Sequence, residues 1–356
     1  MHFIKPDINL DFMGKKYIAF TLSAILIILG MVMLIVRGGP NYGVDFSGGL
    51  MIQIKLPSPQ DASKIREALR PVNLHEGEIQ SLGKEGEAQY LIRVGHSENI
   101  NTETLNDDIS KVLKTSFGEA SEVQRLEMVG PKVGKDLRQK ALFAIFYSIL
   151  FIAIYISGRF EHKWTMSIVM TVCLIIAVLI GTSIGIGITW LIVIALAISV
   201  VLCWVLQLKY AMGAILSLVH DVAITIGAFA LTNREISLTV VAALLTLVGY
   251  SLNDTIIVYD RIRENLKNAP GKKNLEDIMN RSVNQTLSRT ILTSGTVFVV
   301  VAALYFLGGV VIHDFAFALM IGVITGTYSS IYVASPLILL WEGKSDRRGR
   351  KKDSAE

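Results

Sequence analysis

Long apolar runs limit what this chain can fold into more than any other feature of its sequence. Eight segments of roughly twenty residues carry few or no charged side chains, and about twenty apolar residues are what a helix needs to cross the hydrocarbon core of a bilayer. Lipid offers no partner for free backbone N–H and C=O groups, so each run is predicted to be a helix. The predicted spans are Tyr17–Val36, Lys140–Ser157, Thr165–Ser183, Ile188–Leu206, Tyr210–Leu231, Ser237–Tyr259, Leu287–Leu307 and Phe315–Leu340. Hydrophobic residues make up 52% of the chain, and the predicted fold class is a polytopic α-helical membrane protein of about eight spans.

The distribution of Lys and Arg predicts which way the chain is inserted. Most of these residues lie in the connectors on one side of the predicted spans, whereas the short loops on the other side hold only Arg234. Because positively charged loops stay in the cytoplasm, we expect residues 1–16 and the basic tail 342–356 to be cytoplasmic. The sequence therefore predicts a multi-pass protein of the cell inner (cytoplasmic) membrane, with the first helix at 17–36 and residues 37–137 on the periplasmic side.

The segment 37–137 is the one connector long enough to fold as a domain of its own. Strand-like alternation and helical periodicity follow one another in the order βαββαβ, which is the order of a ferredoxin-like α+β domain. No clustered His, Cys or paired acidic residues mark the strands, so binding or gating is expected of this external domain rather than catalysis. The predicted strands are Leu50–Leu56, Glu78–Leu82, Gln89–Val94 and Glu122–Met128, and the predicted helices are Ser58–Leu69 and Asn101–Phe117.

Sequence patterns typical of enzymes, cofactor-binding proteins and metal-binding proteins are absent. The glycine-rich segment Gly43–Gly49 has no Lys and is predicted to enter a strand, unlike a phosphate-binding loop, and no HExxH, GxSxG or paired-Asp pattern stands in a span. Cys173 and Cys203 lie in apolar runs, so we expect no disulfide, no metal and no cofactor. The basic residues 347–352 stand beside a membrane, where they are expected to attract anionic lipid and not nucleic acid. No enzymatic activity is predicted.

Ionisable residues inside the spans need a reason, because a charge at mid-bilayer costs at least about 2.5–3.5 kcal/mol. Asp254 is the leading candidate: with Thr246 and Tyr250 it repeats every four residues and forms a polar stripe that is expected to face other helices. Arg289 begins the next span from the same side, so pairing with Asp254 is geometrically plausible. In the alternative interpretation, Asp254 marks only the end of an apolar run and Arg289 extends its guanidinium to the headgroups.

Asp221 and His220 form a second intramembrane pair. No cation stands in the same helix, so a structural hydrogen bond within the bundle is the simpler interpretation, and tuning of a proton relay is the functional one. Asn253 beside Asp254, together with the largely apolar residues that follow, indicates that the helix continues past Asp254.

Motifs spread along the chain carry a resemblance to a known family. A glycine-rich motif follows the first span, a second motif closes the external domain, and the longest one contains Asp254. The motifs are Gly43-Val44-Asp45-Phe46-Ser47-Gly48-Gly49, Val129-Gly130-Pro131-Lys132-Val133-Gly134, His220-Asp221, Val240–Thr246, Gly249–Asn265 and Gln285–Thr290. In this order they resemble the SecF family of protein-export subunits, part of the SecD/SecF group in the resistance-nodulation-division (RND) superfamily.

The chain departs from that family in one segment. Family members usually have six spans, and here about forty apolar residues are added between Lys163 and Lys209. We expect an inserted helical pair at 165–206, within a transmembrane bundle that covers 138–341, because a pair restores the orientation of every later span. A re-entrant hairpin would do the same.

The resemblance implies a subunit that couples the proton motive force to late-stage export of polypeptides, together with SecD and the SecYEG channel. In SecF-like proteins the positions that match Asp254 and Arg289 are implicated in proton movement, and Asp221 and Asn253 are secondary candidates for this relay. Burial favours the neutral form of a carboxylic acid, whereas a nearby guanidinium favours the charged form. Movement of Arg289 relative to Asp254 would therefore load or release a proton, and the external domain would hold the emerging polypeptide.

Two other function classes stay open. The chain could be one half of a proton-coupled RND exporter of small molecules, or a non-transporting scaffold of the channel. A complete exporter is disfavoured because exporters of that superfamily contain two such halves, and here there is one external domain and one bundle. The buried ionisable residues are an argument against a scaffold.

Overall fold

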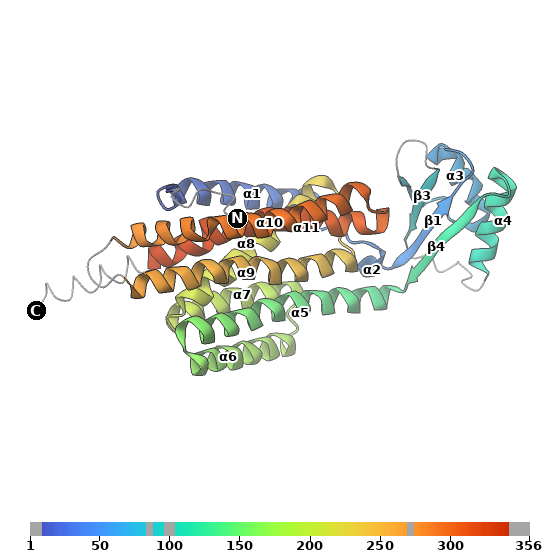
Figure 1. Ribbon diagram of the computed structural model, residues 1–356. Coiled ribbons are helices and arrows are strands. Elements are labelled where there is room, and N and C mark those ends of the chain that lie inside the picture. The colour runs from blue at the N-terminus through green and yellow to red at the C-terminus, as the bar shows by residue number, and fades with distance from the viewer. Residues whose placement is uncertain (1–8, 83–87, 96–103, 269–273, 342–356) are drawn as a thin grey trace, which may run out of the picture.

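The computed structural model describes residues 9–82, 88–95, 104–268 and 274–341. A bundle of long helices runs along one axis, and a smaller domain with a β-sheet, called here the sheet domain (residues 40–130), lies at one end of it (Figure 1). The first long helix leads into the sheet domain, and the second leads back from it into the bundle. The sheet domain is therefore inserted between the first two long helices.

Eight apolar helices form the described part of the bundle. They are α1 (Lys16–Val36), α5 (Pro131–Ile156), α6 (Trp164–Ser183), α7 (Ile188–Val205), α8 (Lys209–Thr232), α9 (Leu238–Lys267), α10 (Leu275–Leu307) and α11 (Val310–Ser329). A π-helical turn, Ser157–Glu161, follows α5, and another, Ser330–Ala334, joins α11 to a last stretch of helix that reaches Trp341.

Within the described ranges, seven of these helices are long and apolar enough to cross a membrane, whereas the sequence predicted eight spans. The exception is α7, whose described apolar part, residues 190–205, is shorter. This helix lies between a turn at Gly185, with a φ of 79°, and Gln207, with a φ of 57°. The left-handed Gln207 follows the C-terminal end of α7, and the left-handed Gly185 follows that of α6.

Three helices extend at least two turns beyond their predicted spans. α5 begins at Pro131, α9 continues to Lys267, and α10 begins at Leu275. The added turns carry many polar and charged residues. Hydropathy therefore identified the apolar part of each helix but not the polar turns that continue it.

The most buried helix of the bundle is α8. It contacts α1, α5, α7, α9 and α11, and most of its residues between Tyr210 and Asp221 are buried. By contrast, α6 packs mainly against α5 and α7 and exposes most of its surface. The α6–α7 pair, which the sequence analysis predicts to be an insertion, thus adds to the side of the bundle (Figure 1).

The sheet domain contains four antiparallel strands in the order β2-β3-β1-β4. Leu50, Ile52 and Ile54 alternate along β1 into a core that two helices close. Met51 and Gln53 point to the opposite face, which is turned towards the bundle. The elements are β1 (Gly49–Lys55), α3 (Ala62–Ala68), β2 (Glu78–Leu82), β3 (Gln89–Val94), α4 (Leu105–Phe117) and β4 (Glu122–Val129), with a short 3₁₀ turn at Arg70–Val72.

The predicted start of the first helix in the sheet domain is wrong by about one turn. The helix was expected from Ser58, but α3 begins at Ala62. Pro59 disfavours helical backbone at the residue before it, and Asp61 caps the helix by accepting a hydrogen bond from the Ser63 N–H.

The glycine-rich segment was expected to enter a strand directly, but it first forms the one-turn helix α2 (Val44–Ser47). Gly48 and Gly49, with φ of 76° and 129°, then turn the chain into β1. Residues other than glycine rarely adopt such backbone angles, which explains the two glycines at this corner.

Candidate functional site

Asp254 lies inside the bundle, where α9 contacts α10. The residue is 1% exposed, and its Oδ2 accepts a hydrogen bond from the Ser294 hydroxyl at 3.0 Å. Its Oδ1 is buried and has no hydrogen-bond partner in the part of the chain that the structure describes. One oxygen of this carboxylate is therefore available for a proton or a water molecule.

Two further hydroxyl groups near Asp254 are buried without a partner among the described residues. They belong to Tyr250, one turn before Asp254 on α9, and to Thr290, one turn before Ser294 on α10. Residues four apart lie on the same face of a helix, so both hydroxyls stand on the faces that carry Asp254 and Ser294. Buried polar groups are normally paired, and a cluster of unpaired ones is a place where water or a proton can bind.

Arg289 lies on α10 five residues before Ser294, about 7.5 Å further from the sheet domain along the helix. The residue is exposed, and no contact of 4.0 Å or less joins its guanidinium to the Asp254 carboxylate. The direct pairing considered plausible from the sequence is absent in this conformation, because Arg289 stands on the outer side of α10.

The polar stripe predicted on α9 is only partly buried. Asp254 is buried and Tyr250 half-buried, whereas Thr246 and the neighbouring Asn253 are exposed. Positions four apart drift by about 40° around a helix at each step, so the stripe winds from the α9–α10 contact to the outer surface. Thr246 is exposed on the surface of this chain, so whether it faces a helix of another chain stays a prediction.

Asp221, the secondary candidate, lies in α8 and is fully buried. Its Oδ1 lies 2.9 Å from His220 Nδ1. Its Oδ2 accepts hydrogen bonds from Ser251 of α9 at 2.6 Å and from Ser329 of α11 at 2.8 Å. The carboxylate thus joins three helices and, unlike that of Asp254, has partners on both oxygens, as the structural interpretation of this pair requires.

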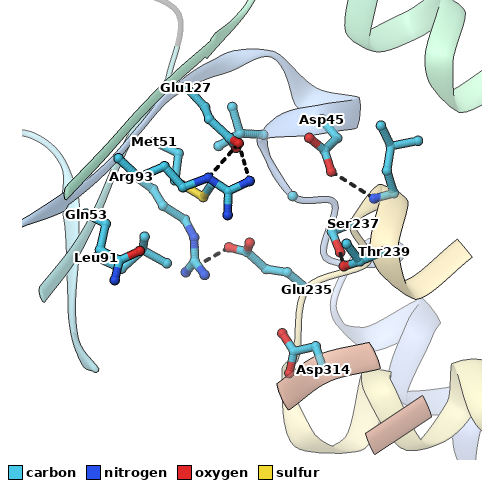
Figure 2. A pocket seen from close by; sticks show the side chains of 14 residues that line it. Asp45, Met51, Gln53, Leu91, Arg93, Glu127, Glu235, Ser237, Thr239 and Asp314 are labelled. Atoms are coloured by element: carbon cyan, nitrogen blue, oxygen red, sulfur yellow. Dashed lines mark hydrogen bonds and ion pairs between the residues drawn. The ribbon is translucent and has the colours of Figure 1, made fainter. Parts of the chain in front are cut away.

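A cavity of about 320 Å³ lies between the open face of the sheet and the nearest end of the bundle (Figure 2). Arg93 of β3 reaches across it and forms an ion pair of 2.9 Å with Glu235, which stands between α8 and α9. Beside it, Asp45 of α2 accepts a hydrogen bond of 2.8 Å from the Leu238 N–H at the start of α9. The α8–α9 connection is therefore one point where the sheet domain is attached to the bundle.

The same connection is anchored on the bundle side by Arg234. Its guanidinium pairs with Asp314, donates to the Tyr305 hydroxyl at 3.0 Å and lies 4.4 Å from the Phe317 ring centre. On the other side, burial raises the pKa of the Glu235 carboxyl to about 7, although the nearby guanidinium acts in the opposite direction. The attachment of the sheet domain thus contains a group that titrates near neutral pH.

Sequence reasoning missed the partners of both buried carboxylates. Ser251, Ser294 and Ser329 are serines within apolar helices, where this residue commonly bonds to the backbone of its own helix. The sequence held one signal for these partners: Thr290 and Ser294 are four residues apart, so their hydroxyls lie on the same face of the helix. Among the residues that the structure describes, no group of three His, Cys, Asp or Glu side chains is arranged to hold a metal ion.

Comparison with known proteins was made by family, by sequence and by structure. The family model described as "Protein export membrane protein SecD/SecF, C-terminal" matches residues 108–196 and 181–344. The two stretches overlap within the α6–α7 region, where the sequence analysis predicts the insertion. The matched residues include Asp221, Asp254 and Arg289.

Curated relatives match over nearly the whole chain. The protein translocase subunit SecF of Calditerrivibrio nitroreducens is 41% identical over 346 residues, which cover 96% of this chain and 96% of the relative. The protein translocase subunit SecF of Magnetococcus marinus is 40% identical over 341 residues, which cover 96% of this chain and 94% of the relative. These relatives bear the names of translocase subunits and not of enzymes.

The fold is similar to that of a solved structure, the translocon-associated membrane protein SecDF from Thermus thermophilus. The TM-score is 0.69 at 28% sequence identity, and the match covers 96% of this chain. It covers 40% of the SecDF chain, so this chain corresponds to less than half of that longer protein.

Proposed function

Because the chain belongs to the SecD/SecF family of protein-export membrane proteins, as a SecF-type translocase subunit, we propose that it couples the proton motive force to late-stage export of polypeptides across the cytoplasmic membrane. Its proposed partners are SecD and the SecYEG channel. The observation that carries the proposal is the buried Asp254 carboxylate, with one free oxygen, at the contact between two helices. A lipid-embedded acid without a charged partner in contact needs a functional reason.

The proposed architecture follows the same family. The strand order β2-β3-β1-β4 and the element order βαββαβ support a ferredoxin-like sheet domain on the periplasmic side. If α7 crosses the inner membrane as an eighth span, both termini lie in the cytoplasm, as the position of the Lys and Arg residues requires.

In the proposed mechanism, Asp254 binds a proton at its free Oδ1 and loses it when Arg289 approaches. The guanidinium of Arg289 stabilises the ionised carboxylate of Asp254. When the guanidinium moves away from the carboxylate again, rebinding of a proton is favoured. α9 transmits the movement, because its first N–H is bonded to Asp45 of the sheet domain. Asp221 and Asn253 are proposed to contribute to the relay in a secondary role.

The SecD partner is proposed to cover the outer surface of α9 and α10. Thr246, Gly249 and Asn253 are exposed along α9, and Gly295 is exposed on α10. Among the described residues, a Cβ atom added at either glycine would meet no atom within 4 Å outside its own stretch of helix. Polar and small residues on a membrane-embedded surface are typical of helix–helix contacts. SecDF, of which this chain matches 40%, supports a partner half of this kind.

The test is export of a secreted reporter in cells that lack their own SecF, restored with wild type, Asp254→Asn or Arg289→Met at equal membrane levels. Asp260→Asn and Arg281→Met are the matched controls, because they change an exposed acid of α9 and an exposed Arg of α10. We expect both site variants to lose the proton-dependent part of export and both controls to keep it. Full rescue by both site variants would contradict proton coupling and favour the scaffold.

A further inference from the structure

A series of hydrogen bonds joins α1 to the centre of the bundle through His220. Its Nε2 lies 2.9 Å from the hydroxyl oxygen of Ser23 on α1. The Ser23 hydroxyl lies 3.2 Å from the hydroxyl of Tyr328 on α11, which lies 2.7 Å from the backbone carbonyl oxygen of Ala19, again on α1. The Tyr328 ring also stacks on the imidazole, with ring centres 5.9 Å apart. Two residues of other helices thus hold one segment of α1.

Counting hydrogens assigns a proton to His220 Nε2. A carbonyl oxygen only accepts, so the Tyr328 hydroxyl donates to Ala19, and its oxygen must accept the hydroxyl hydrogen of Ser23. Ser23 then has no hydrogen left for the imidazole, and Nε2–H must donate to the Ser23 oxygen. An imidazole with a bare Nε2 leaves one of the three contacts without a hydrogen.

The other ring nitrogen requires a second proton. Nδ1 lies 2.9 Å from Asp221 Oδ1, and one hydrogen must stand between the two atoms. The pair therefore holds two protons and has no net charge, either as imidazolium with carboxylate or as neutral imidazole with carboxylic acid. Both residues are at most 5% exposed, and such burial favours a pair without net charge.

The two helices that meet at this pair are parallel and closely packed. Ser23 and His220, which are in contact, are 197 residues apart. Gly30 and Gly227 are separated by the same number of residues, and an added Cβ on Gly30 would lie 2.7 Å from the Gly227 Cα. Seven residues span about 10.5 Å of helix, so α1 and α8 are in register over two turns. α1 leads directly into the sheet domain, and a change at Ser23 is carried along it.

We propose that His220 and Asp221 form a proton-binding site, separate from Asp254, whose two-proton form holds α1 against α8 and α11. When Nε2 loses its proton, the Ser23 hydroxyl turns to Nε2 and leaves Tyr328. The groups that face the pair are Ser23 from α1, Ser251 from α9, and Tyr328 and Ser329 from α11. Among the described residues, no charged side chain outside the pair contacts it. The hydrogen count does not depend on the proposed export function.

The test is nitrogen NMR of the full chain, labelled with ¹⁵N-histidine and held in lipid nanodiscs. The sequence has six histidines, and His220→Gln identifies the signal that belongs to this residue. We expect a protonated Nε2 at neutral pH. An unprotonated Nε2 overturns the proposal.

Tyr328→Phe probes the hydrogen count itself. Phe keeps the ring but removes the acceptor of the Ser23 hydrogen, so Ser23 can donate to Nε2, and the proton affinity of Nε2 falls about tenfold, the effect of one hydrogen bond. Ser23→Ala removes the acceptor of Nε2–H and is expected to act in the same direction. Thr21→Ala is the control, because within the described residues this hydroxyl donates to the Tyr17 carbonyl of its own helix.

An unchanged proton affinity in both folded variants contradicts the proposal. Asp254→Asn separates the two hypotheses. It is expected to abolish proton-dependent export and leave the His220 signal unchanged.

Discussion

Arg93 and Glu235 form an ion pair of 2.9 Å across the junction between the sheet domain and the bundle. The two side chains are 19% and 16% exposed, so water screens the contact only in part. Among the ion pairs of the described residues, it is the one that joins the two parts of the molecule. The attachment of the sheet domain should therefore depend on the charge of Glu235.

The first prediction concerns pH. The pKa of Glu235 is raised from 4.5 to about 7 in the attached state, so this state binds a proton more tightly than a detached one. Attachment is fully stabilised below pH 4.5, weakens as pH rises through about 7, and changes little above that. Glu235→Gln should remove this dependence, measured as the distance between spin labels on the sheet domain and the bundle from pH 4.5 to about 8.

Glu127→Gln is the control, since Glu127 lines the same cavity but pairs with Arg125 of its own strand. It should keep the pH dependence. If attachment still depends on pH in Glu235→Gln, another titratable group causes the pH dependence.

The second prediction concerns the cation of the pair. Arg93→Gln leaves Glu235 largely buried without its partner, and we expect attachment at pH 8 to weaken by about 1–3 kcal/mol. The double variant Arg93→Gln/Glu235→Gln should recover much of this loss, because no unpaired charge remains. Limited proteolysis of the junction in the four proteins measures the coupling. A double variant as weak as Arg93→Gln alone would show that the loss comes from packing.

The sequence predicted the helices well because lipid imposes a strong rule on them: a span must be long, apolar and helical. It also singled out Asp254, since an acid within such a run is conspicuous, and this residue is buried in the bundle. It could not identify Ser294 or Ser251 as partners of the buried carboxylates, because a serine in an apolar helix has the same local pattern whether it bonds across the bundle or to its own backbone.

The third prediction tests the hydrogen bond to Asp254. Ser294→Ala leaves both carboxylate oxygens without a donor and changes the balance between the charged and neutral forms by about 1 kcal/mol. Proton-dependent export should fall several-fold rather than vanish, measured at equal membrane levels. Thr296→Ala is the control, because this exposed hydroxyl donates to Thr293 of its own helix. If Ser294→Ala and Thr296→Ala reduce export equally, the Ser294 hydroxyl has no specific role at Asp254.

The fourth prediction tests the proposed SecD surface. Gly249→Trp adds a large side chain where no atom of the described residues outside its own stretch of helix lies within 4 Å of the new Cβ, so the chain itself should fold normally. Association with SecD should fall at least tenfold by co-purification, because close helix approach needs the glycine. Val172→Trp, at an exposed position of α6, should leave it unchanged. Undiminished association in Gly249→Trp would place SecD elsewhere.

Charge and hydropathy patterns could not predict the arrangement of the helices around α8. Gly30 and Gly227 show the reason: each is one glycine in an apolar run, and their meaning appears only when α1 and α8 lie side by side in parallel. The position of Arg289 was missed for a related reason, because the sequence gives its depth along α10 but not the side of the helix on which it stands. The α6–α7 pair was predicted to be an insertion because the family it resembles usually has six spans, but its place at the side of the bundle depends on these same contacts.

The fifth prediction concerns this helix contact. A methyl group at Gly30 would lie 2.7 Å from the Gly227 Cα, so Gly30→Ala must move α1 away from α8. Overpacking of this kind costs about 1–3 kcal/mol, and the thermal stability of the protein in nanodiscs should fall accordingly. Gly295→Ala is the matched control, since a Cβ there meets no described atom within 4 Å outside its own stretch of helix. Because Ser23 lies two turns away on the same face of α1, Gly30→Ala should also weaken its bond to His220, visible in the same ¹⁵N spectrum. A loss of stability with an unchanged His220 signal would show that the two contacts along α1 act independently.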